Sequence, residues 1–479
     1  MDKWAAKLSQ DALLVLTGLP RGSEFGFDGR LWVLDRFSGV KFLPEGLHFF
    51  VFSAAPTSSS SSLPTTDVAS TAQGVGARHA LLRFFRKGER VVLEWHNARE
   101  ELKRAPDAGS STRRRRTTAQ AHADEARETV ISEEYLQSLD KSLAAYPADE
   151  LRDQWAALAG FVSEETLARV VGLDEQACAT CDALVGSSQD EAGAVQGGPS
   201  ARRTWGKARE DEPEVREVVD VDGDEGEDGA AAPADSGLLE FVRFDDKRSW
   251  PEGAVGAELT RWSKDKSWQL SRVVNEQLGG DPKELLAELQ LAFILFTLVH
   301  NFSSLSTYKA LFSLVCRAST LARPSSRRDA SSPYTADLLA DSALPLFASF
   351  LSTFLAQVEF LDESFFTTQL PSLEQHLVES LGHLSQALSD ALPQWEELGA
   401  RDEAVAGVWR EVVKRWDALA KATTAKFGWD LGIIRGSRAK YLSAAGRSKR
   451  DEDEVDLEDL EEGEDAPVVV DDDALHDVY

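Results

Sequence analysis

The sequence has only three cysteines and lacks the short motifs that mark the common classes of enzyme. Cys178, Cys181 and Cys316 are too few and too unevenly spaced for a disulfide framework, which favours a reducing compartment. There is no Walker-type phosphate loop, zinc-protease motif, nucleophile elbow or EF-hand loop. The sequence therefore offers no known motif for catalysis, for a cofactor or for a metal. A hydrolase without a known motif stays open, because clustered titratable groups in a pocket are invisible in a sequence.

Two pairs of residues have a metal-like spacing but lack further ligands. Cys178-Ala-Thr-Cys181 has no second cysteine pair and no nearby histidine to complete four zinc ligands. We therefore predict two free thiols near a helix end. His376 and His383 are seven residues apart on one helix face, and we interpret them as surface or core histidines.

Long apolar runs are also absent. The most apolar segment, LAFILFTLV at 291–299, is about half of the ~20 residues that cross a membrane. It is therefore expected to be a core helix. The amino-terminal stretch MDKWAAKLSQDALLVL lacks the form of a secretion signal, and we expect no membrane association.

Basic residues are scarce, with 52 Lys and Arg against 81 Asp and Glu and a formal charge of −29. The excess of negative charge lies in two segments. Residues 451–479 have a net charge of −15 and residues 208–246 a net charge of −12, which leaves −2 for the rest of the chain. A nearly neutral folded part offers no broad basic surface, so a protein partner is favoured over nucleic acid. The alternative is an RNA-binding module that uses the basic segments 113–116 and 435–450, although direct RNA contact is expected to be weak or absent.

Strand signals fill residues 12–96, where ALLVL, RLWVL, LHFFVFS, HALLRFF and RVVLEW are rich in β-branched and aromatic residues. LHFFVFS is apolar on both faces, so it should lie centrally with layers on both sides. The loop LPRGSEFGFD, residues 19–28, leads into a strand and not into a helix. We therefore interpret it as a turn and not as an anion site.

The last two strand segments predict a hairpin over residues 79–96, with its turn at Lys87-Gly88. In the second strand of this hairpin, strict alternation predicts that Val91, Leu93 and Trp95 face the core.

Helical periodicity begins at Ser132 and predicts a helix through Leu143. Two short helices follow, ADELRDQWAALAGF and SEETLARVVG, of which the second starts at Ser163 and stops at Gly172.

From about 255 to 431 the sequence predicts helices throughout. Asp281 as a cap and Pro282 at the first helical position are a strong start signal for the segment that includes LAFILFTLV, which should be the central helix of a bundle. Pro345 is expected to kink a later helix. Trp409 and Trp416 lie on one helix face, for which core packing is favoured over an interface.

The predicted fold class is α+β multidomain, with a β-rich, sandwich-like N-terminal domain and an all-α helical-bundle C-terminal domain. The predicted order along the chain is a β-rich domain at 1–186 with mobile insertions at 54–77 and 105–128, a disordered acidic linker at 187–237, a helical domain at 238–432 and a disordered acidic tail at 433–479. Arg113 to Arg116 lie in the second insertion, where a solvated linker is favoured and a nuclear import signal or a kinase-recognition site over Arg113 to Thr118 stays open.

Several irregular motifs of the sequence resemble those of one protein family, and they follow one another in the same order. These are LPRGSEFGFD with FSGVKFLPEGLHFFVFS, LQSLDKSLAAYP, QWAALAGFVSEETLARV, SWPEGAVGAELTRWSKDKSWQLSRVVN, ELLAELQLAFILF, KFGWDL and APVVV. Together they resemble the Aar-two (a-one-cistron) splicing factors. The sequence departs from the family pattern in longer insertions at 54–77, 105–128, 187–237 and about 317–333.

The resemblance implies an assembly factor of the U-five small nuclear ribonucleoprotein, which is not an enzyme and holds no cofactor. Such a factor binds the ribonuclease-H-like and Jab/MPN-type domains of the spliceosomal scaffold protein Prp-eight and prevents premature docking of the Brr-two helicase. It implies a protein of the cytoplasm and nucleus that is a monomer in isolation.

The acidic tail contains a short apolar segment, Ala466, Pro467, Val468, Val469 and Val470. Its valines have high strand propensity, and with the resemblance they predict a strand added to an edge on the scaffold, steered by the flanking acids. A solubilising tail is the alternative. Ser448 precedes the acidic run, which makes it a candidate phosphorylation switch for release.

Overall fold

The computed structural model describes residues 11–33, 37–53, 78–96, 101–104, 138–174, 177–187, 238–328, 332–339 and 343–434. The predicted insertions at 54–77 and 105–128 lie outside these ranges, as do nearly all of the predicted linker and tail. The described N-terminal region is rich in strands and the region from 257 to 427 is helical, which confirms the predicted fold class.

The strands form two five-stranded sheets. The mixed sheet has the order β8 (Glu101–Arg104), β7 (Arg90–His96), β1 (Ala12–Thr17), β4 (Gly39–Leu43) and β9 (Leu143–Ala145). The antiparallel sheet has the order β10 (Cys178–Asp182), β6 (His79–Phe85), β5 (Gly46–Ser53), β2 (Glu24–Phe27) and β3 (Arg30–Val33). Val91, Leu93 and Trp95 of β7 are buried between the sheets, as predicted.

Strand β5 is central and is buried on both faces, as its apolar sequence predicts. Phe50 and Phe52 join the core between the two sheets. Phe49 and Val51 point to the opposite face, where they join a larger core built mainly by the helices. The antiparallel sheet is therefore a middle layer, which explains why LHFFVFS has no polar face.

The hairpin predicted over residues 79–96 is wrong. Strand β6 pairs with β5 and β10, whereas β7 pairs with β1 and β8 in the other sheet. The Lys87-Gly88 turn therefore carries the chain from one sheet to the other. The side chain of Glu89, at the end of this turn, accepts hydrogen bonds from Arg83 and from the backbone N–H of Arg86.

The stretch 19–28 is more than a turn, which corrects its interpretation. Glu24–Phe27 forms β2, and its Phe25 and Phe27 are buried between the sheets. The predicted turn lies at Arg21-Gly22, where the Ser23 N–H donates a hydrogen bond to the Pro20 carbonyl. A second turn follows at Asp28-Gly29, with φ of 47° and 87°. Two positive φ values in a two-residue loop are the mark of a type I′ hairpin, which joins β2 to β3.

The helix predicted from Ser132 to Leu143 does not extend that far. Residues 138 and 139 are helical, and a short 3₁₀ turn follows at Asp140–Ser142. Leu143–Ala145 then forms β9, in which Leu143 pairs with Gly39 of β4. Pairing with a distant strand overrides the local helical periodicity here. Ser132 lies outside the described residues.

The helical elements are listed here by their bounds: α4 (Ala148–Ala159), α5 (Glu164–Val170), α7 (Ala257–Lys264), α8 (Ser267–Arg272), α9 (Pro282–Ile294), α10 (Phe302–Cys316), α11 (Ala343–Phe360), α12 (Phe365–Thr368), α13 (Pro371–Gly399) and α14 (Glu403–Phe427). Ser163 and Asp281 cap α5 and α9 as predicted, each accepting a hydrogen bond from a backbone N–H of the first turn. A π-helical turn, Leu295–Val299, continues α9.

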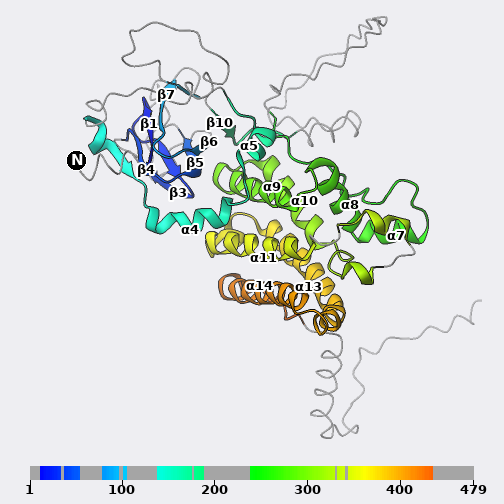
Figure 1. The fold of residues 1–479 in the computed structure, drawn as a ribbon. Helices are drawn as coiled ribbons and strands as arrows, with labels where there is room; N and C mark the ends of the chain where they lie inside the picture. The colour runs from blue at the N-terminus through cyan, green and yellow to red at the C-terminus, as the bar shows by residue number, and fades with distance from the viewer. Residues whose placement is uncertain are drawn as a thin grey trace, which may run out of the picture. The chain divides into compact units, whose positions relative to one another are not determined.

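The core of the helical region is built around α9 and α11. All residues of α9 from Leu285 to Ile294 are buried, as expected for a central helix. Helix α11 packs along α14 (Figure 1). By length and composition α11 is the one helix among the described residues that could cross a membrane, but most of it is buried inside the protein, as is typical of a core helix.

The predicted kink at Pro345 is wrong. Pro345 is the third residue of α11, where its missing N–H costs no helical hydrogen bond. Among the described residues, Pro393 of α13 is the proline that lies in a helix interior.

Candidate protein-binding surface

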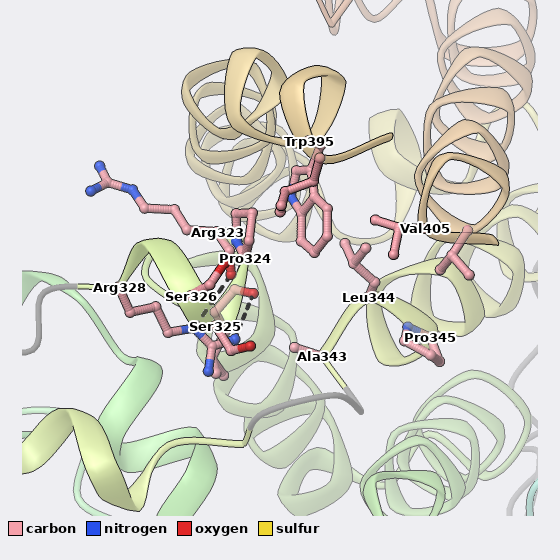
Figure 2. Close-up of a pocket in the computed structure, with 13 residues that line it drawn as sticks. Arg323, Pro324, Ser325, Ser326, Arg328, Ala343, Leu344, Pro345, Trp395 and Val405 are labelled. Atoms are coloured by element: carbon pink, nitrogen blue, oxygen red, sulfur yellow. Dashed lines mark hydrogen bonds between the residues drawn. The ribbon is translucent and has the colours of Figure 1, made fainter. Parts of the chain in front are cut away.

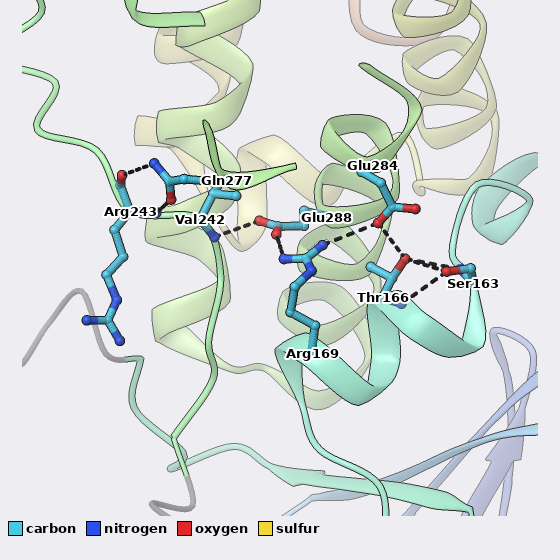
Figure 3. A network of polar contacts seen from close by, with 8 residues as sticks. All are labelled: Ser163, Thr166, Arg169, Val242, Arg243, Gln277, Glu284 and Glu288. Carbon is cyan, nitrogen blue, oxygen red and sulfur yellow. Dashed lines mark hydrogen bonds and ion pairs between the residues drawn. The ribbon is translucent and has the colours of Figure 1, made fainter. Parts of the chain in front are cut away.

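A buried carboxylate joins the β-rich and helical regions. Glu288 of α9 is fully buried, and its Oε1 accepts a hydrogen bond from the Arg169 guanidinium of α5. Its Oε2 accepts from the backbone N–H of Val242 at 2.9 Å (Figure 3). Burial raises the pKa of Glu288, although Arg169 acts in the opposite direction. One side chain thus ties α5, α9 and the segment at Val242 together.

Neighbouring contacts extend this junction. Arg169 also lies 3.3 Å from Glu284, which accepts a hydrogen bond from Thr166 at 3.0 Å (Figure 3). The side-chain amide of Gln277 holds the backbone of Arg243 from both sides, at 2.9 Å and 2.8 Å. The charged and polar groups of this network bind one another and leave little capacity for a ligand. We therefore assign the network a structural role.

A second polar cluster lies under the β2–β3 hairpin. The carboxylate of Asp28 accepts hydrogen bonds from His48 Nδ1 at 2.7 Å, from the Tyr146 hydroxyl at 2.6 Å and from the Phe49 N–H at 2.9 Å. Burial raises the pKa of Tyr146 above its usual range. The cluster fixes the hairpin turn to β5 and to the segment before α4.

The hairpin carries an exposed apolar edge. Strand β3 pairs with β2 and ends the antiparallel sheet, and among the described residues no strand pairs with its outer side. Leu31, Trp32 and Val33 are 42%, 39% and 74% exposed. We call Arg30–Val33 the β3 edge. Edge strands are usually protected by charge, proline or a covering element, so an apolar one marks an interaction surface.

A cavity of about 550 Å³ lies beside the β3 edge. Its wall is formed by Gly29 and Leu31 from the hairpin, by Arg78, and by His300 and Phe360 from the helical region. Arg78 Nη1 lies 2.7 Å from His300 Nε2, and burial together with Arg78 lowers the pKa of His300. A neutral His300 can accept the hydrogen bond from Arg78. This bond holds the two side chains in place in the cavity wall.

Cys178 and Cys181 are thiols that form no disulfide, as predicted, but they do not lie near a helix end. Cys178 and Cys181 belong to β10, and both are buried. Their separation of three residues puts them on opposite faces of the strand, with Cys178 in the core between the sheets and Cys181 in the helical core. Burial raises their pKa values to about 11 and about 12. They cannot chelate one metal ion together.

The histidine pair and the tryptophan pair follow the structural predictions. His376 is half-buried and lies 3.0 Å from the carbonyl of Lys309, whereas His383 is exposed. Trp409 and Trp416 are buried in the helical core. Within the described ranges, no group of three or more His, Cys, Asp or Glu side chains is placed to hold a metal ion.

Several predicted sites lie outside the described residues. These are the tail segment Ala466–Val470, the switch candidate Ser448, and both basic segments, 113–116 and 435–450. They stay predictions.

Comparison with known proteins decides the family. The family model described as the AAR2 N-terminal domain matches residues 10–172, and the one described as the AAR2 C-terminal repeat region matches residues 241–432. The chain belongs to the AAR2 family. The human protein AAR2 homolog is 29% identical over 327 residues, which cover 66% of this chain and 73% of the relative. The homolog of Pongo abelii gives the same identity and coverage, and that of Caenorhabditis elegans is 25% identical over 313 residues, which cover 64% and 71%.

AAR2 membership confirms the resemblance found in the sequence and supports a splicing-related assembly role based on contacts between proteins. The β3 edge lies in the part of the chain that matches the AAR2 N-terminal domain, and α9 to α14 lie in the part that matches the AAR2 C-terminal repeat region. The match leaves out residues 173–240 and 433–479, which contain most of the acidic excess.

The β3 edge is the surface that the sequence predictions missed. RLWVL was predicted to be a strand, but nothing in it showed that it would end a sheet. One local signal was available, because Asp-Gly between two strand segments is the strongest short-range mark of a two-residue hairpin.

Proposed function

We propose that this chain is a non-catalytic assembly factor that binds the Prp-eight scaffold protein during maturation of the U-five small nuclear ribonucleoprotein. It engages the ribonuclease-H-like and Jab/MPN-type domains of the scaffold and delays docking of the Brr-two helicase. The observation that carries this proposal is the ordered match of both AAR2 family models, over 10–172 and 241–432.

Two features of the chain support binding to a large protein. The β3 edge is apolar and, within the described part of the chain, unpaired on one side. The acidic tail carries Ala466–Val470, which we propose adds a strand to the scaffold while the flanking acids steer it to a basic surface. Phosphorylation of Ser448 would add negative charge just before the acidic run that starts at Asp451 and promote release. The proposed sites of action are the cytoplasm and nucleus, and the proposed free state is a monomer.

Titration calorimetry with the purified ribonuclease-H-like and Jab/MPN-type domains tests the proposal. We expect each domain, or the two together, to bind the full chain in a saturable 1:1 complex, and we expect Brr-two to be excluded from that complex. Absence of heat with both domains contradicts the proposal.

A parallel titration with single-stranded RNA tests the alternative. Tight RNA binding with a steep salt dependence, and no scaffold binding, would favour an RNA-binding module that uses 113–116 and 435–450.

A further inference from the structure

The helical region has an apolar groove that none of the assigned roles uses. Its volume is about 300 Å³, and it lies where the end of α13, the start of α14 and the start of α11 meet the loop after α10. The apolar walls are formed by Leu321, Leu344, Trp395, Leu398, Val405 and Val408. We call these six residues the α13–α14 groove. Figure 2 shows the side chain of Leu344 between those of Trp395 and Val405, and all three line the groove.

The groove is rigid because its aromatic wall is held from two sides. Trp395 Nε1 donates a hydrogen bond to the carbonyl of Ala322 at 2.8 Å. The Trp395 ring also stacks on Trp409, with centroids 5.8 Å apart and planes 13° apart. Leu321 and Leu344 are buried, so the floor is packed. A preformed groove binds with little loss of conformational entropy.

The mouth of the groove is apolar and open to solvent. Val408 is 41% exposed, although a valine gains from burial. A cavity of this volume has room for about one or two large apolar side chains and not for a whole helix. The occupant therefore inserts side chains and leaves its backbone outside.

The charge around the mouth is positive, against the acidic character of the whole chain. Residues 317–328 contain four arginines and no Asp or Glu. Arg323 lines the groove, is exposed, and has no ion pair with any described residue. Figure 2 shows its side chain extending from the loop, away from the apolar wall. Arg327 and Arg401 share a single acid, Glu397, at 2.7 Å and 3.1 Å.

The first turn of α14 adds no unpaired acid to the mouth of the groove through Glu403. Glu403, in the first turn of α14, is already paired with Arg410. Glu396, next to Trp395 on α13, is also exposed and has no ion pair with a described residue, but the charged residues that line the groove itself are Arg323 and Arg328. An arginine beside an apolar groove selects a carboxylate next to an apolar anchor.

We propose that the α13–α14 groove binds an acidic segment of a partner protein, which inserts one or two large apolar side chains beside Trp395 and places a carboxylate against Arg323. The occupant is a short peptide with a Leu, Ile, Phe or Trp flanked by Asp or Glu. This inference does not rest on the identity of the scaffold proposed above.

A displayed peptide library, selected against the purified full chain, tests the proposal. We expect selected peptides to carry a large apolar residue flanked by acids. The affinities of synthetic versions are then measured by fluorescence polarisation for wild type, Val408→Glu and Arg323→Glu. Each substitution is at an exposed position, and each is expected to weaken binding about tenfold or more.

Matched controls separate the groove from general charge effects. Val255→Glu makes the same change at a position that is 77% exposed outside the groove, and Arg21→Glu does so for an exposed arginine. Both controls should bind the peptides as wild type does. Thermal unfolding of all four variants confirms folding.

Three outcomes overturn the proposal. The first is a selection that yields no acidic apolar peptide. The second is an affinity that the two groove variants leave unchanged or that the controls lower equally. The third is binding of decanoate at the groove without any peptide binding, which would make the ligand a fatty acid.

Discussion

The side chains of His48 and Asp28 form a buried ion pair in which Nδ1 lies 2.7 Å from Oδ2. The other ring nitrogen of His48 lies 2.9 Å from the carbonyl oxygen of Pro44, which can only accept a hydrogen bond. Both ring nitrogens therefore donate, and the imidazole is charged. This pair anchors the hairpin turn that presents the β3 edge.

Replacing Asp28 with Asn is expected to destabilise the protein by about 3 kcal/mol, because a buried charge loses its partner. The amide also brings an N–H donor to a site where three donors converge. Urea denaturation measures the free energy of unfolding. The control is Asp153→Asn at an exposed position of α4, with an expected change within about 0.5 kcal/mol. Equal losses in the two variants would contradict the ion pair.

The ion pair also predicts a pH dependence. Burial alone lowers the pKa of His48, but the charge of Asp28 and the hydrogen bonds from Asp28 and Pro44 outweigh it, so the pKa is raised above 6.5. Since the folded state holds the proton more tightly, the stabilisation is fully present below pH 6.5 and is lost as the pH rises through the raised pKa.

The difference in unfolding free energy between wild type and His48→Gln isolates this contribution from those of other groups. It should be largest near about pH 5.5 and should shrink toward about pH 9. A difference that grows with pH would show that His48 is buried in its neutral form.

A side chain at Gly29 is expected to destabilise the protein. A Cβ at this position would lie 2.5 Å from Cε2 of Phe360, and its φ is 87°. Gly29→Ala should therefore cost the strain of a positive φ, about 1–2 kcal/mol, and a further cost of the clash with α11. Gly172→Ala is the matched control, because the φ of Gly172, 85°, is nearly that of Gly29 and a Cβ there meets no atom within 4 Å. A thermal unfolding midpoint that falls no further for Gly29→Ala than for Gly172→Ala would contradict this packing.

If the β3 edge binds the scaffold, lysines introduced on it should weaken scaffold binding and leave the stability of the protein unchanged. In the double variant Leu31→Lys/Val33→Lys, stability should change little because both positions are exposed, while affinity for the scaffold domains falls about tenfold. Val255→Lys serves as the exposed control. Scaffold binding that is equally strong in all three proteins would remove the β3 edge from the interface.

The tail hypothesis predicts that deletion of residues 464–473 weakens scaffold binding, because the backbone hydrogen bonds of an added strand are lost. It also predicts that Ser448→Glu shortens the lifetime of the complex and that Ser448→Ala does not. Surface plasmon resonance gives both the affinity and the lifetime. If the deletion leaves the affinity unchanged, the tail serves solubility only.

Local chemistry determined much of this protein from the sequence alone. Asp281 with Pro282, and Ser163 with Thr166, set helix starts because a cap satisfies backbone N–H groups only a few residues away. The two apolar faces of β5 likewise predicted a middle layer, since side chains in a strand alternate by necessity. The irregular motifs identified the family.

Tertiary structure decided which distant segments meet. Residues 79–96 look like a hairpin, but β6 and β7 take partners in different sheets. Leu143 fits a helical pattern, but β4 recruits it into a strand, and only the order of the sheet leaves Trp32 at an edge. The same holds for Trp395 and Arg323, 72 positions apart, which line one groove. Periodicity records whether a side chain is buried, whereas the identity of its neighbours depends on contacts that close long loops and leave no local trace in the chain.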